Sequence, residues 1–168
     1  MKAVARKDLI VLLNKCWMTH DGMWFYSCLQ EFGIEKANKL NKSAIKLLAP
    51  IEVKRMKNAL AMEGEIDSFD QFKEFVQGAY ELVIPDFMGA QMSFPRENVL
   101  RWTFKQNQCF AYKGMNSIGV IADYECGVIY RLACWFRSLG LAFDVVPPMD
   151  KCLMHYRGNC EGDFVFRF

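Results

Sequence analysis

The sequence lacks long apolar runs and a marked excess of either charge. No stretch approaches the roughly 18 uninterrupted apolar residues of a membrane-spanning helix. The apolar run Leu9 to Leu13, which follows a basic start, is shorter than the core of a signal peptide. Lys and Arg number 21 against 19 Asp and Glu, a net charge of only +2, which argues against a dedicated nucleic-acid binder. We therefore expect a cytoplasmic protein with neither membrane nor nucleic acid as a partner.

Several catalytic signatures are also missing. The sequence contains no Gly-x-x-x-x-Gly-Lys loop for nucleotides, no Gly-x-Gly-x-x-Gly for dinucleotides and no Gly-x-Ser-x-Gly elbow. The only histidines are His20 and His155, too few for a His-Asp metal phosphohydrolase site. These absences leave open whether the chain is an enzyme.

What the sequence does have is a large apolar and aromatic content. Of its 168 residues 52% are hydrophobic and 14% aromatic, with 10 Met and 14 Phe, which excludes a disordered chain. This length suits one domain over residues 1–168. We expect a mainly helical half at 1–85 and a strand-rich half with one helix at 86–168.

Apolar residues recur at three- and four-residue steps in the first half and predict helices at 7–32, 35–49 and 51–62. Gly33 should end the first, and Pro50 should break the second or open the third. Ser68 with Gln71 resembles a capping box that starts a fourth helix, ending before Pro85.

In the second half, alternation of apolar and polar residues predicts strands at 98–105 and 163–168. A turn at 106–108 suggests a second strand at 109–113, and residues 117–139 and 141–146 are expected to form a helix and a buried strand. The predicted fold class is α+β, with N-terminal helices packed on a small antiparallel sheet and one helix inserted between the strands.

A Cys/His cluster near the C-terminus is the first candidate site. Cys152, His155 and Cys160 follow a Cys-x-x-His spacing and a turn, a pattern that suits zinc or iron. Cys126, Cys16 or His20 would supply a fourth ligand, and Cys126 is the one we include. In the alternative interpretation the cysteines are small buried residues beside a turn.

The second candidate is an apolar pocket beside the first helix. Cys16, His20, Trp24 and Cys28 are four residues apart and share one face. His20 is then either a core histidine with one hydrogen bond or a pocket residue, and Asp21 orients a neighbour or faces water. The candidate lining residues are Trp17, His20, Trp24 and Trp102.

Two segments resemble known families. Residues 95–168 resemble the end of the 4-vinyl reductase domain, also called a hydrocarbon-binding domain, in Cys126-Gly127, Leu139-Gly140, Cys152…Gly158-Asn159-Cys160 and Asp163-Phe164-Val165-Phe166. The N-terminal part resembles a family of uncharacterised bacterial cytosolic proteins, associated with the same superfamily and an aminothiazoline-carboxylate hydrolase-like group, in Thr19-His20-Asp21-Gly22-x-Trp24, Gly33 and Ala37-Asn38-Lys39-Leu40-Asn41. The resemblance implies a homodimer of α+β fold, an apolar pocket for a hydrocarbon or tetrapyrrole-like ligand, and a metal at the cysteines.

Three functions follow from these observations. The leading hypothesis is a small-molecule-binding domain with an aromatic pocket. The alternative is a zinc-dependent hydrolase, in which the C-terminal Cys/His cluster holds a metal with an open position that activates water. The third is a structural or interaction protein that forms a homodimer.

Overall fold

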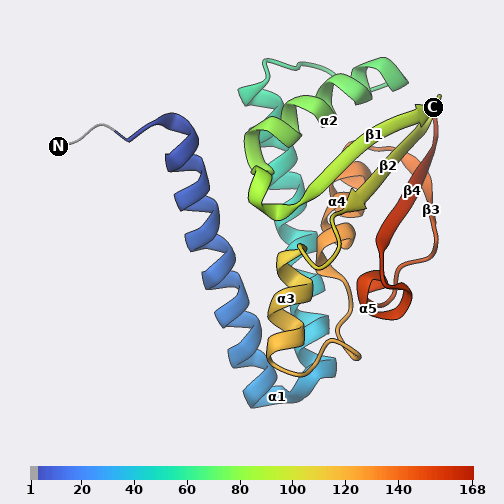
Figure 1. Ribbon diagram of the computed structural model, residues 1–168. Coiled ribbons are helices and arrows are strands. Elements are labelled where there is room, and N and C mark those ends of the chain that lie inside the picture. Colours follow the sequence, from blue (N-terminus) through green and yellow to red (C-terminus); the bar gives the residue numbers. More distant parts are fainter. Residues whose placement is uncertain (1–3) are drawn as a thin grey trace.

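The computed structural model describes residues 4–168, so Met1, Lys2 and Ala3 of the basic start lie outside the described residues. The described part contains five α-helices, one short 3-10 helix and four strands (Figure 1). In chain order they are α1 (Arg6–Ala59), α2 (Phe69–Val83), η1 (Asp86–Met88), β1 (Ala90–Arg96), β2 (Val99–Phe104), α3 (Phe110–Ser117), α4 (Gly127–Ser138), β3 (Ala142–Val146), α5 (Leu153–Arg157) and β4 (Cys160–Arg167). The predicted α+β class is confirmed.

Helix α1 consists of two segments that meet at Gly33. Gly33 has φ +77° and ψ 171°, a backbone conformation essentially restricted to glycine. The chain turns back there, so residues 6–32, which we call the arm, run down one side and residues 34–59, the second segment, run back up (Figure 1). The predicted stop at Gly33 is therefore confirmed as a sharp bend.

The prediction that Pro50 breaks the helix or opens a new one is wrong. Pro50 lies inside the second segment, whose backbone stays helical around it. A proline removes only one backbone N–H donor, and packing of the helix around it overrides that loss. Ala49 and Val53, on either side of Pro50, are buried in the core.

The capping box at the start of α2 is confirmed. The Ser68 hydroxyl accepts a hydrogen bond from the Gln71 backbone N–H at 3.4 Å. The Gln71 side chain in turn accepts one from the Asp67 N–H at 3.0 Å. The first bond satisfies an N–H group that has no other partner in the first helical turn, and the second ties the residue before the N-cap to the helix.

The strands form one antiparallel sheet in the order β1-β2-β4-β3. Trp102 on β2 pairs with Gly162 on β4, and the two face the helices. A Cβ atom at position 162 would lie 2.3 Å from the Trp102 ring, so this glycine makes room for the indole. The sheet thereby places Trp102 in the core rather than at the surface.

Two predictions in the second half are wrong. Residues 109–113 are not a strand, because Cys109 is the N-cap residue of α3, and the single helix at 117–139 is replaced by the end of α3, a loop and α4. Three helices, α3, α4 and α5, therefore lie between the strands instead of one. Alternation over five residues does not separate a strand from one turn of helix, and Pro95 obscures the pattern of β1, which was not predicted.

The core has three layers. Helices α2 and α4 cover the inner face of the sheet, with Phe72 4.3 Å from Phe166 and Phe136 4.9 Å from Phe164 between ring centroids. Helix α1 packs on the other side of α4 (Figure 1). Within residues 4–168 no helix is both long and apolar enough to cross a membrane.

Candidate ligand-binding site

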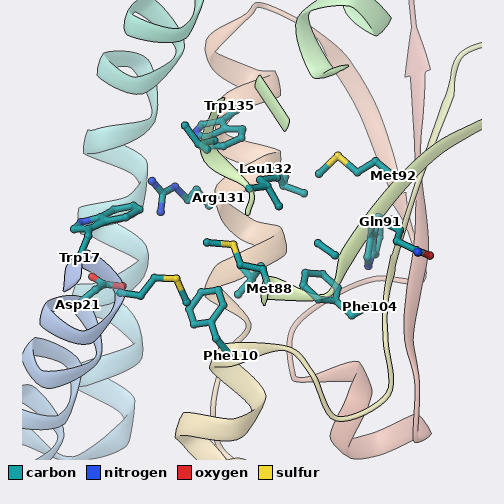
Figure 2. A pocket seen from close by; sticks show the side chains of 16 residues that line it. Trp17, Asp21, Met88, Gln91, Met92, Phe104, Phe110, Arg131, Leu132 and Trp135 are labelled. Atoms are coloured by element: carbon teal, nitrogen blue, oxygen red, sulfur yellow. The ribbon is translucent and has the colours of Figure 1, made fainter. Parts of the chain in front are cut away.

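The arm, α4 and the inner face of the sheet converge on a cavity of about 80 Å³, which we call the main cavity. Its walls are mostly apolar, and Asp21 and Arg131 are the charged residues among them (Figure 2). The lining residues are Trp17, Met18, Asp21, Val83, Ile84, Met88, Ala90, Gln91, Met92, Trp102, Phe104, Phe110, Val128, Arg131, Leu132 and Trp135. An apolar enclosure with a few polar groups is typical of small-molecule sites.

A second cavity of about 410 Å³ adjoins the main cavity. It shares Met18, Asp21 and Phe110 with the main cavity and extends along the arm to Phe25 and Tyr124. The arm thus contributes to the walls of both spaces.

Arg131 on α4 is held by one carboxylate and two aromatic rings. Its guanidinium donates through Nε and Nη2 to Glu52 on the second segment of α1. The Trp135 indole N–H donates to the same carboxylate at 2.7 Å. The guanidinium also lies over Trp17 of the arm, 4.2 Å from the ring centroid, and 5.6 Å from the Trp135 ring (Figure 2). One side chain therefore connects three helical segments at the edge of the main cavity.

Asp21 lies on the arm one turn beyond Trp17, on the same side of the cavity (Figure 2). Partial burial raises the pKa of its carboxyl above the ordinary value of 3.8, while the positive charge of Arg131 and the neighbouring His20 act in the opposite direction. No donor in residues 4–168 forms a hydrogen bond with this carboxylate. It is a charged group with unused acceptor capacity beside an apolar space.

Two of the four predicted pocket residues line the main cavity and two do not. Trp17 and Trp102 are in its wall. His20 and Trp24 are exposed and line neither cavity, and 60% of the Trp24 side chain is accessible. The reason is that the arm turns only a narrow stripe toward the body, and its buried residues are Phe25 and Cys28.

The structure brings three of the predicted metal ligands close to a fourth cysteine that sequence reasoning missed. Cys109, Cys126 and Cys152 are the N-cap residues of α3, α4 and α5, and Cys160 begins β4. All four, which we call the thiol cluster, are buried. His155 is exposed on α5, with its ring next to that of Tyr156. The missed residue, Cys109, lies 17 positions before Cys126 and far from any motif.

The members of the thiol cluster are close enough for a charge on one to affect the others. Burial is the main cause that raises the pKa of Cys126 and that of Cys160 to about 12, and the neighbouring thiols add to it. The thiols of Cys126 and Cys160 are therefore protonated at neutral pH. Among residues 4–168 no group of three or more His, Cys, Asp or Glu side chains stands in the arrangement of a metal site.

Trp102 connects the thiol cluster to the main cavity. Its indole N–H is buried and makes no hydrogen bond of good geometry within the described part of the chain. It lies beside the Cys160 thiol and opposes the larger effect of burial on that pKa. The two candidate sites of the sequence are therefore neighbours in the fold.

Comparison with known proteins adds one finding to this geometry. A family of unknown function (DUF6125) matches residues 2–86, about half of the chain. The chain belongs to this family. No curated protein and no solved structure gives a significant match.

The DUF6125 region comprises both segments of α1 together with α2. It contributes Trp17, Asp21 and Val83 to the main cavity and Glu52 to the pairing of Arg131. The sheet and α4, which complete the cavity, lie beyond the match. Arg131 and Glu52 are 79 residues apart, so no local pattern predicts that they pair.

Proposed function

We propose that the protein binds a small, largely apolar molecule in the main cavity. The observation that supports this most is the convergence of three separate layers on one apolar space that carries the Asp21 carboxylate and a fixed Arg131 at its edge. A core built only for stability fills such a space with side chains, because interiors pack to the density of organic crystals.

The arm supports the proposal because it is lightly attached. Between Arg6 and Trp24 it has no buried residue. Its contacts with the body include the Trp17–Arg131 stack, an edge contact of Phe25 with Tyr124 at 5.7 Å and an exposed Lys7–Asp86 ion pair. A benzene-sized guest needs about 150 Å³. The main cavity, at about 80 Å³, would reach this size if the arm moved outward.

Filling the cavity tests the proposal. Ala90 lies in its wall at the start of β1, so Ala90→Leu occupies the space with a side chain. Ala142→Leu on the exposed face of β3 is the matched control. The probes are toluene and 2-phenylethanol. Their binding is measured by the thermal shift and by quenching of tryptophan fluorescence.

We expect both probes to stabilise the unmodified protein and the Ala142→Leu variant but not Ala90→Leu. Equal responses of the two variants would place the binding elsewhere, and no response of the unmodified protein to any small aromatic compound would refute the proposal.

A second candidate function is binding of a soft metal ion at the thiol cluster. What favours it is the set of four buried thiols from four separate elements, with the Trp102 N–H beside one of them. Four thiolates suit zinc or iron, and an N–H donor stabilises a metal-bound thiolate. Binding would require the side chains to draw together and release their protons.

Elemental analysis of protein purified without a histidine tag tests this candidate. We expect about one zinc or iron per chain, lost in Cys152→Ser and in Cys109→Ser. Cys134→Ser is the control, because Cys134 is also buried but lies in the middle of α4, outside the cluster. Retention of metal in Cys109→Ser with loss in His155→Ala would instead support the ligand set predicted from the sequence.

A further inference from the structure

The charged side chains around the main cavity differ in whether they already have a partner of opposite charge. Arg131 has its Nε and Nη2 donors on Glu52, and the rings of Trp17 and Trp135 lie near its guanidinium. Glu52 accepts from both Arg131 and Trp135, and its side chain is only 16% exposed. A ligand carboxylate that took Arg131 away would leave Glu52 as a buried unpaired charge, which is strongly unfavourable. The pair therefore carries no net charge, although the Nη1 donors of Arg131 form no hydrogen bond within the described part of the chain.

Asp21 is the other charged residue in the wall of the main cavity, and unlike Arg131 it has no ion-pair partner in the described part of the chain. It lies in the wall of the main cavity, and no residue of the described chain donates a hydrogen bond to it. Arg131 is near enough to influence it, yet the two do not form an ion pair. Asp21 is exposed at the edge of this apolar space. The partner that such a carboxylate binds most strongly is itself cationic and able to donate a hydrogen bond.

The other groups near Asp21 do not replace such a partner. His20 is its exposed neighbour on the arm, and Lys15 and Tyr124 line the second cavity with it. The Lys15 ammonium lies over the Phe87 ring, 5.4 Å from its centroid. Inside the main cavity the walls are otherwise apolar apart from Gln91.

From this charge arrangement we infer that the ligand of the main cavity is an apolar amine, whose hydrocarbon part lies among Met88, Met92 and Phe104 and whose ammonium group binds Asp21. This inference rests on the proposed function, because it assigns a chemical class to the occupant of the same cavity. Carboxylates of the same size are disfavoured, because Glu52 already neutralises Arg131 and the Asp21 carboxylate repels a second negative charge.

A set of three probes of nearly equal shape tests the inference. They are 2-phenylethylamine, 2-phenylethanol and 3-phenylpropionate, titrated into the full chain by calorimetry near neutral pH. We expect the amine to bind about tenfold or more tightly than the alcohol, the size of effect of one charge-assisted hydrogen bond, and the carboxylate to bind least well.

Two variants identify the group responsible. Asp21→Asn keeps the shape and removes the charge, and it should reduce amine affinity to that of the alcohol while leaving alcohol binding unchanged. Glu31→Gln removes the same charge from an exposed position on the same arm and should change neither.

The outcomes separate this inference from the proposed function. Tighter binding of the carboxylate, or amine binding that is unaffected in Asp21→Asn, would overturn the amine assignment while the cavity stays a binding site. If none of the three compounds binds, and Ala90→Leu responds to toluene as the unmodified protein does, the proposed function fails and the inference fails with it.

Discussion

The guanidinium of Arg131 lies 4.2 Å from the centre of the Trp17 ring and so joins the arm to α4. The arm has few other attachments along its first half, where every residue before Phe25 is exposed or only partly buried. This contact therefore holds one wall of the main cavity in place.

Replacing Trp17 by alanine should loosen the arm without unfolding the body. A cation–π contact at a partly exposed site contributes about 0.5–2 kcal/mol. We expect amide hydrogen exchange in residues 10–24 to become up to about tenfold faster in Trp17→Ala, while exchange in α4 and the sheet is unchanged. Trp24→Ala removes an exposed indole from the same arm and should have no such effect; equal acceleration in both variants would show that the contact does not restrain the arm.

Removing the charge of Glu52 should destabilise the fold. Glu52→Gln leaves the Arg131 guanidinium, 24% exposed, without its counter-charge. Breaking a fully buried pair costs about 3–5 kcal/mol, and partial exposure reduces this to roughly 2 kcal/mol. Urea unfolding gives the value, and Asp144→Asn, which removes one partner of the exposed Asp144–Arg167 pair, should change it by less than about 0.5 kcal/mol. A loss for Glu52→Gln no larger than that of the control contradicts the structural role of the pair.

Alanine substitutions at the two glycines of α1 should change the free energy of unfolding in opposite directions. Gly33 has φ +77°, so Gly33→Ala strains the bend and should lower the free energy of unfolding by about 1–3 kcal/mol. Gly22 is helical and a Cβ there meets nothing within 4 Å, so Gly22→Ala should raise it by up to about 1 kcal/mol. Urea unfolding followed by circular dichroism measures both. Equal stability of the two variants would mean that the bend at Gly33 does not persist in solution.

The ionisation of Asp21 should reduce stability as the pH rises. Because partial burial raises its pKa in the folded protein, the folded state holds this proton more tightly than the unfolded chain does. The contribution of Asp21 to the free energy of unfolding is fully present below its ordinary pKa of 3.8. It is lost as the pH rises through the raised pKa of the folded protein.

The variant Asp21→Asn measures that loss. We expect it to match the unmodified protein near about pH 3 and to be more stable than it near about pH 7 in urea unfolding. The nearby groups that titrate or carry charge are His20, Lys15, Tyr124 and Arg131, so the same comparison in a His20→Gln background separates the histidine from Asp21. Lower stability of Asp21→Asn at neutral pH would show that the carboxylate has a favourable partner when folded.

Local patterns in the sequence determined the fold class and most of the helices. The three- and four-residue period of the first half, the glycine at 33 and the Ser68–Gln71 cap all describe interactions within a few residues, and each is found in the structure. The strand at 99–104 follows from alternation in the same way. The strand at 142–146 was expected to be buried, but its side chains alternate between exposed and partly buried. The predictions that are wrong, at Pro50 and at 109–113, concern positions where packing against distant segments outweighs local preference.

Tertiary structure alone decided which residues form the candidate sites. The sequence singled out Trp17 and Trp102 for the pocket and Cys126, Cys152 and Cys160 for a metal, and the fold brings these groups together with Asp21 and Cys109. It leaves His20, Trp24 and His155 at the surface, because helical spacing defines a face but not what covers it. The pairing of Glu52 with Arg131 depends on how α1 lies against α4. Because the two residues are 79 positions apart, no local sequence motif predicts this contact.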